Sequence, residues 1–216
     1  MTPPSPNPDT RGLDPADLTI PHTESGMAIG LFGGSFNPPH SGHRLVAGTA
    51  RRRLGLDRVW WMVTPGNPLK DHGMLKPIGE RVAAVRAMVP PAFNTVTAFE
   101  AAHRVRFTAD ALRILLQRRP GVRFVWIMGA DSLASFHRWQ DWHWIVENVP
   151  IAVVDRPGAT LSALSSPMAS TYRARRLPEY DAPALASREA PAWVFLHGPR
   201  TPVSSTLLRS HGGATS

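Results

Sequence analysis

The chain has 216 residues, a hydrophobic content of 43% and a formal net charge of +8. This length and apolar content suit one domain with a sizeable core. The absence of cysteine excludes disulfides, thiolate chemistry and cysteine-based zinc sites, and it suits a reducing cytoplasm, which is the expected compartment. No apolar run approaches the roughly 18–20 residues that span a bilayer, and residues 1–26 lack the apolar centre of a signal peptide.

The basic residues are nearly all arginines, and they are scattered along the chain. Such a balance is compatible with nucleic-acid binding, but also with a small polyanionic ligand, because phosphates favour guanidinium groups. The arginines do not alternate with aromatic residues along one element. We therefore expect a solvated basic surface for most of them, with no nucleic-acid and no membrane partner.

Short apolar runs and helical periodicity divide the chain into alternating elements. Residues 1–25 are rich in Pro, Thr, Asp and Ser and predict a disordered or loosely ordered tail. Strands are predicted over 27–32, 59–63, 94–98, 123–128, 151–155 and 193–197. Helices are predicted over 38–54, 80–88, 108–118, 132–148, part of 168–176 and 204–209. The domain is expected to cover 26–211, and residues 212–216 form a second tail.

This alternation predicts an α/β fold: a single-domain, Rossmann-like, doubly wound parallel sheet with right-handed crossovers. Ligands of such sheets bind beyond the carboxyl ends of the strands, near the point where the strand order reverses. Neither a GxxxxGK[ST] nor a GxGxxG motif is present, so the common phosphate-binding loops are excluded.

The stretch from Ile29 to His43, IGLFGGSFNPPHSGH, combines an apolar strand, two glycines and a helix start. Gly33 and Gly34 lack a Cβ, so the chain can turn sharply there and a ligand can approach the backbone. Asn37 is placed to cap the helix, with Pro38 at its first position. The N-terminus of this helix favours an anion such as phosphate.

His40 and His43 lie three residues apart and share one face of the expected helix. Two imidazoles directly after a glycine turn indicate donors directed at an anion, against the plainer alternative of ordinary helix histidines. A zinc site is disfavoured, because HExxH spacing and a nearby third ligand are lacking.

Further polar groups follow other strands. Asp131 comes directly after a strand, where a carboxylate can bind ribose hydroxyls or cap the next helix; the residues alone leave both open. Lys70 ends a Pro-rich loop and can either contact a phosphate or be solvated. The segment from Ser204 to Arg209 places hydroxyls at a helix start, with an arginine one turn later, which makes an anion site.

Three motifs, GGSFNPPHSGH, GADSLASFHRWQDW and VSSTLLR, together resemble those of bacterial nicotinate mononucleotide adenylyltransferases, in the HxGH nucleotidylyltransferase superfamily. The resemblance covers about residues 27–211. It departs from the family at Phe107, where a tyrosine is usual, and at Asn37, where many relatives have aspartate. The chain also stops soon after Arg209, where many relatives carry a longer final helix.

The resemblance implies transfer of AMP from ATP to nicotinate mononucleotide, with Mg²⁺ bound mainly through the ATP phosphates and no metal held by the protein itself. It implies a catalytic role for His40, His43 and Arg209. The implied ATP-binding residues are Gly33, Gly34, Ser35, Phe36, His40, His43, Gly129, Asp131, Ser204, Ser205, Thr206 and Arg209. The implied mononucleotide-binding residues are Ser35, Asn67, Lys70, Thr108 and Trp139.

Each implied role has a plainer alternative. Thr108 is also a good N-cap, and Trp139, which the resemblance stacks on the pyridine ring, can be packing like Trp142 and Trp144. The alternative function is a nucleotide-sensing or RNA-binding module that keeps the fold without turnover. The sequence leaves open whether the protein is a monomer or a homo-oligomer.

Overall fold

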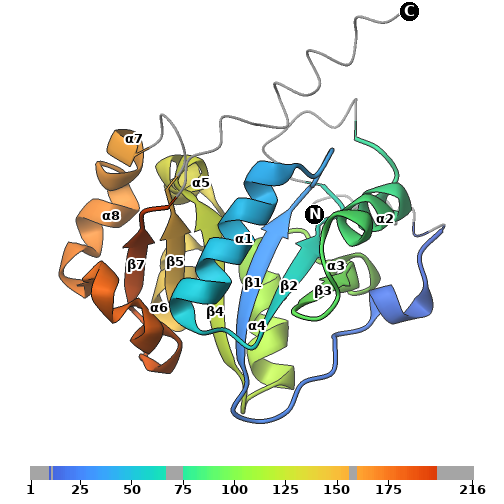
Figure 1. Ribbon diagram of the computed structural model, residues 1–216, viewed down its shortest axis with the longest axis horizontal. Coiled ribbons are helices and arrows are strands. Elements are labelled where there is room, and N and C mark those ends of the chain that lie inside the picture. The colour runs from blue at the N-terminus through green and yellow to red at the C-terminus, as the bar shows by residue number, and fades with distance from the viewer. Residues whose placement is uncertain (1–9, 11, 67–74, 156–159, 199–216) are drawn as a thin grey trace, which may run out of the picture.

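The computed structural model describes residues 10, 12–66, 75–155 and 160–198, and their centre is a parallel sheet. Within these residues the sheet has seven strands in the order β3-β2-β1-β4-β5-β7-β6, and every neighbouring pair is parallel. The strands are β1 Ala28–Gly34, β2 Arg58–Val63, β3 Asn94–Thr97, β4 Arg123–Gly129, β5 Ile151–Val154, β6 Arg176–Leu177 and β7 Trp193–Leu196. The predicted α/β fold with a doubly wound parallel sheet is confirmed (Figure 1).

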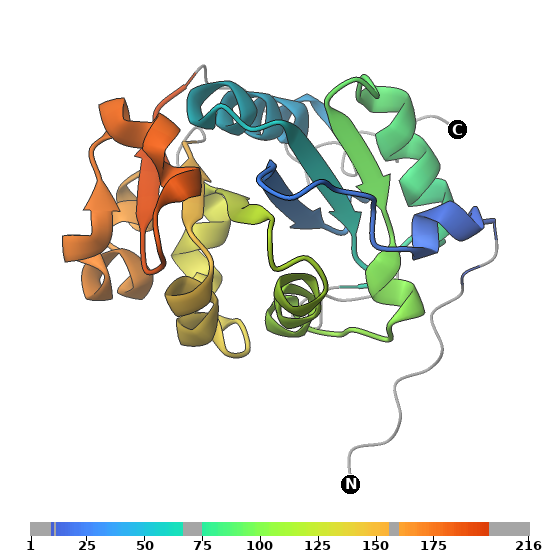
Figure 2. The ribbon, with the colours of Figure 1, turned by 90° about the horizontal axis from the view of Figure 1, so that it is seen from below.

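Helices cover both faces of the sheet (Figure 2). The α-helices are α1 Ser41–Leu54, α2 Ile78–Met88, α3 Phe99–Ala102, α4 Thr108–Arg118, α5 Ala130–Ser135, α6 Trp142–Asn148, α7 Thr160–Leu164 and α8 Pro167–Thr171. The 3-10 helices are η1 Pro15–Leu18, η2 Phe136–Arg138, η3 Arg173–Arg175 and η4 Glu179–Ser187. None of the described helices is long and apolar enough to cross a membrane.

Each face of the sheet has its own hydrophobic core. On one face, α1, α2 and η4 bury Val46, Val82 and Leu185 against the sheet. On the other, α4, α5 and α6 bury Leu112, Leu133 and Ile145. Side chains of successive strand residues point to opposite faces, so both faces of a central strand such as β4 are apolar, as expected for a parallel sheet covered on both sides.

Several predicted elements differ in their bounds. The predicted helix over 132–148 is divided into α5, η2 and α6, with Asp141 at φ 54° between the last two. The region 168–176 contains α8 and η3 and also supplies β6, a two-residue edge strand too short to show a pattern. The predicted helix over 204–209 lies outside the described residues.

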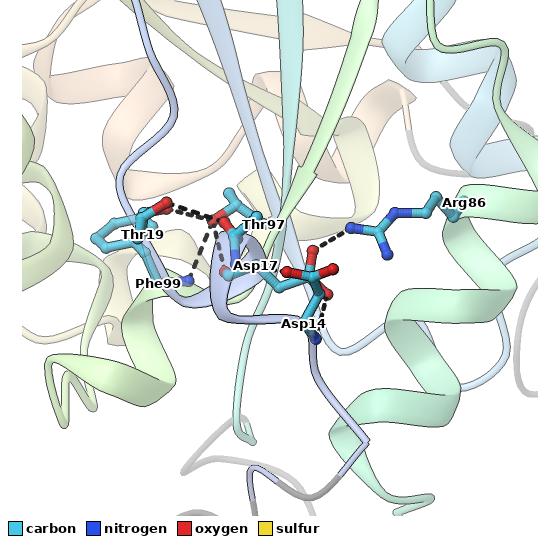
Figure 3. A network of polar contacts seen from close by, with 7 residues as sticks. Asp14, Asp17, Thr19, Arg86, Thr97 and Phe99 are labelled. Atoms are coloured by element: carbon cyan, nitrogen blue, oxygen red, sulfur yellow. Dashed lines mark hydrogen bonds and ion pairs between the residues drawn. The ribbon is translucent and has the colours of Figure 1, made fainter.

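The prediction of a loosely ordered tail over 1–25 is wrong for the segment from Asp14 to Thr19 (Figure 3). The backbone oxygen of Asp17 accepts hydrogen bonds from the N–H of Ala98 at 2.7 Å and from Oγ1 of Thr97 at 3.2 Å. The side chain of Asp17 is 2% exposed and forms an ion pair with Arg86 of α2. Local composition missed these bonds because their partners lie far away in sequence.

We predict that Asp17→Ala lowers the free energy of unfolding by about 1–3 kcal/mol, because a charge-assisted contact to a buried group is lost. Denaturant unfolding of the variant checks this. Glu189→Ala, which removes an exposed carboxylate, is the matched control and is expected to stay within about 0.5 kcal/mol of the parent. Equal stability of both variants would contradict the anchoring role of Asp17.

Candidate active site

The two central strands, β1 and β4, diverge at their carboxyl ends. Their register pairs Ala28 with Arg123 and ends at Leu31 and Trp126, although the strands run on to Gly34 and Gly129. Over this last part β1 stays paired with β2, and β4 stays paired with β5. The strand order also reverses between β1 and β4. This is the position at which doubly wound sheets bind their ligands.

Gly33 and Gly34 belong to strand β1, so the prediction that they form a tight turn is wrong. The glycines are needed for another reason. A Cβ on Gly33 would lie 2.6 Å from Cη2 of Trp126, and one on Gly34 would lie 3.1 Å from Cζ of Phe36. Rings from β4 and from the following loop therefore pack directly against the backbone of β1.

Phe36 makes the turn that the glycines were expected to make. Its φ is 45°, which few non-glycine residues adopt, and its side chain is 2% exposed. Its ring contacts those of Phe32, His43 and Trp61 at centroid distances of 5.6, 5.1 and 5.3 Å. This aromatic cluster stabilises the unusual backbone and fixes one side of His43.

The start of helix α1 also differs from the prediction. Its N-cap is His40, and the helix begins at Ser41, so Asn37 is not the cap. The Asn37 side chain accepts a hydrogen bond from the N–H of Lys76 at 3.3 Å instead. Asn37 thus connects the loop after β1 to the segment before α2.

His40 and His43 form a stacked pair, with ring centroids 3.7 Å apart. Nδ1 of His40 accepts from the N–H of Gly42 at 3.1 Å, and Nδ1 of His43 accepts from the N–H of His40 at 3.2 Å. A neutral imidazole that accepts at Nδ1 carries its proton on Nε2. The backbone therefore sets both rings in the tautomer whose Nε2–H can donate to an anionic oxygen.

Arg81 of α2 holds the loops beside the histidines, and sequence reasoning missed it. Nε and the two terminal nitrogens donate to the backbone oxygens of Ser35, Thr64, Pro65 and Lys76 at 2.7–3.2 Å. The residue is 2% exposed, and burial lowers its pKa to about 10, so it stays charged at neutral pH. The available signal was an arginine on the buried face of a helix, between Ile78, Val82 and Val85.

The residues predicted on the β4 side lie at the same edge of the sheet. Gly129 ends β4, and Asp131 is exposed in the first turn of α5, whose N-cap is Gly129. The alternative that Asp131 caps this helix is therefore wrong. Thr108 is the first residue of α4 and not its N-cap, which is Phe107, so the capping alternative is wrong there too.

Trp139 is half-buried between the core and the site. Its ring makes edge contacts with Phe136 and Trp126 at centroid distances of 5.2 and 6.1 Å, and Trp126 in turn reaches Gly33. Trp142 packs on the rings of Phe136, His143 and Tyr172, while Trp144 lies under the guanidinium of Arg113 at 4.3 Å. The packing role predicted for Trp142 and Trp144 is confirmed.

Some predicted site residues lie outside the described residues: Asn67, Lys70, Ser204, Ser205, Thr206 and Arg209. Within the part of the chain that the structure describes, no three His, Asp or Glu side chains gather as metal ligands would. The main site candidates that the structure describes are the histidine pair at the start of α1, and Asp131 and Trp139 after β4.

A parallel sheet that diverges at its reversal point, with paired imidazoles at the start of the first crossover helix, defines a nucleotide-binding α/β protein of the nucleotidyltransferase class. The family model described as cytidylyltransferase-like matches residues 31–211, so the chain belongs to this family.

Within this family, the chain is similar to curated proteins that share one name. The protein named "Probable nicotinate-nucleotide adenylyltransferase" of Mesorhizobium japonicum is 60% identical over 88% of this chain and 97% of its own length. The one of the same name from Rhizobium meliloti is 61% identical over 85% and 98%. Two solved structures of the Plasmodium falciparum nicotinic acid mononucleotide adenylyltransferase, one complexed with NaAD, share the fold with TM-scores of 0.61 and 0.63 at 14% and 15% identity, each covering 85% of this chain and 83% of its own.

We predict that Arg81→Ala lowers the free energy of unfolding by about 3 kcal/mol or more, because it leaves buried carbonyl oxygens without donors. Arg81→Lys is expected to recover part of the loss, since an ammonium cannot match the planar guanidinium fork. Thermal and denaturant unfolding measure both variants, with the exposed Arg188→Ala as control. An Arg81→Ala variant as stable as this control would contradict the assignment.

Proposed function

We propose that the protein transfers AMP from ATP to nicotinate mononucleotide, giving nicotinate adenine dinucleotide and pyrophosphate, in NAD biosynthesis. The observation that carries the proposal is the stacked pair of His40 and His43, held with Nε2–H donors beside the point where β1 and β4 diverge. The relatives' shared name supports the choice of substrates. Both substrates are dissolved phosphate esters, and the cytoplasm is the compartment we propose.

In this reaction a phosphate oxygen of the mononucleotide attacks the α-phosphorus of ATP. The bond from that phosphorus to the bridging oxygen of the β-phosphate breaks, and pyrophosphate leaves with the bonding electron pair. No covalent nucleophile on the protein is needed, so the chain's task is positioning and charge neutralisation. His40 and His43 donate to the oxygens on which negative charge accumulates, and Arg209 with Ser204, Ser205 and Thr206 is proposed to hold the triphosphate.

The donor set near the histidines suits anionic oxygens, whereas Mg²⁺ prefers carboxylate and water oxygens. We therefore assign Mg²⁺ to the ATP phosphates, where it would neutralise charge when bound. Asp131 is proposed to accept hydrogen bonds from the ATP ribose, while Gly33, Gly34, Ser35, Phe36 and Gly129 line the nucleotide.

On the acceptor side, Trp139 offers a half-exposed indole for the pyridine ring. The first N–H groups of α4, at Thr108, have no partner within the helix and can donate to the nicotinate carboxylate. Ser35, Asn67 and Lys70 complete the proposed mononucleotide site.

His43→Ala is expected to lower kcat by on the order of 10²-fold or more, because one donor to a developing oxyanion is worth about that much. Pyrophosphate release by the folded variant measures the effect. His22→Ala, which removes an exposed histidine of the N-terminal segment, is the control and should leave kcat unchanged. A His43→Ala enzyme with the turnover of this control would refute the role.

The acceptor is tested with nicotinate mononucleotide, nicotinamide mononucleotide and phosphopantetheine side by side. We expect the highest kcat/KM for nicotinate mononucleotide, because backbone N–H groups favour its carboxylate over a neutral amide. A preference for the amide would overturn the acceptor choice. Absence of pyrophosphate release with every acceptor, together with tight RNA binding, would favour the alternative of a binding module.

A further inference from the structure

A groove of about 520 Å³ lies beside α1, on the side that faces β2 and β3. One wall is a stripe of α1 that begins at Ser41, next to His40, and continues to Arg52. The other wall is the segment from Val89 to Asn94, between α2 and β3, and Trp61 of β2 also lines the groove. Its volume is in the range of small-ligand sites.

Among the described residues, the groove is lined by three arginines, Arg44, Arg51 and Arg52, and by no Asp or Glu. None of the three forms an ion pair among the described residues. By contrast, the next residue, Arg53, does not line the groove and forms an ion pair with Glu179 at 3.0 Å. Uncompensated positive charge is therefore concentrated on the groove side of α1.

Arg51 is held in place by an aromatic ring. Its guanidinium carbon lies 3.5 Å from the ring centroid of Phe93, a side chain that is 45% exposed. Nε of Arg51 is buried, without a hydrogen-bond partner among the described residues, and is out of reach of a ligand in the groove. Stacking uses the face of a guanidinium, so the N–H groups of the two terminal nitrogens can still donate to such a ligand.

Gly48 lies between these arginines in the interior of α1. Glycine destabilises a helix interior relative to alanine, and it adds no side chain to the groove. A Cβ at this position would make an ordinary van der Waals contact with Nη1 of Arg52, at 3.4 Å. A larger side chain would extend into the groove between Arg44 and Arg51.

We propose that this groove is a second anion site, which binds a ligand with two or more phosphate groups, separate from the proposed ATP and mononucleotide sites. Arg44 and Arg51 are seven residues apart on one helix face, which is about 10 Å along the axis. The guanidinium groups are therefore spread along the groove, and an oligophosphate chain can contact more of them at once than a single phosphate can. Guanidinium groups without carboxylate partners bind phosphate oxygens by charge-assisted, often bidentate hydrogen bonds.

The test is a titration of the ¹⁵N-labelled full chain with inorganic tripolyphosphate, followed by amide chemical shifts. We expect saturable shifts at Gly48 and Asn94, in addition to those at Gly34 and His43. Arg51→Gln/Arg52→Gln should weaken binding at Gly48 and Asn94 by on the order of 10²-fold, since two charged hydrogen-bond donors are lost. Its shifts at Gly34 and His43 should be unchanged, which separates this proposal from the proposed function.

Two further variants control for net charge and for folding. Arg173→Gln/Arg175→Gln removes the same charge from exposed positions elsewhere and should bind like the parent. Gly48→Leu fills the groove without changing charge, favours the helix, and should weaken groove binding by about tenfold or more. Shifts confined to Gly34 and His43, or equal losses in the two double variants, would overturn the proposal.

Two more probes define the ligand. If GTP changes the amide chemical shifts of Gly48 and Asn94 with the same affinity as tripolyphosphate, the phosphate chain is sufficient for binding. Tighter binding of GTP would identify a nucleotide as the ligand. The third probe is a single-stranded oligonucleotide of about 20 nucleotides. If it binds the groove much more tightly than tripolyphosphate and GTP do, the proposal is overturned in favour of nucleic-acid binding.

Discussion

The buried guanidinium of Arg81 is the interaction on which the candidate site depends. Taking this cation out of water is costly, and the cost is offset by backbone oxygens from the loops that follow β1 and β2 and from the segment before α2. The carbonyl dipoles satisfy its donors but carry no net negative charge. The site loops are therefore joined by a group that also leaves a positive potential beside the histidines, which favours anionic ligands.

The sheet supplies the second constraint, because its two central strands part before they end. Each keeps its outer neighbour, so the divergence costs few backbone hydrogen bonds. The first crossover helix packs on one face of the sheet, and the half-buried Trp139 packs on the other. Trp126 links β1 to Trp139 on that second face, since its ring packs on Gly33 and touches Trp139. The glycine is required by this packing and not by a turn.

The arginines of this chain serve different purposes that composition cannot separate. Arg81 is buried and binds carbonyl oxygens, and Arg86 anchors the N-terminal segment through Asp17. The arginines of the α1 groove have no acidic partner in the part of the chain that the structure describes. The excess of arginine in the sequence therefore covers three different roles: joining loops, anchoring the N-terminal segment and forming a candidate anion site. The difference lies in what each guanidinium faces, which is decided by residues distant in the chain.

The sequence by itself determined the alternation of strands and helices along most of the chain, the doubly wound fold and the place of His40 and His43 after the first strand. These features follow from local periodicity and from a contiguous motif. The sequence could not show that Phe36 makes the turn, that His40 caps α1, that Arg81 joins the loops or that the segment around Asp17 is folded onto β3. Each of these depends on contacts between residues far apart in sequence, whose energies exceed the local preferences. Only the tertiary structure brings those partners together, so only it could decide them.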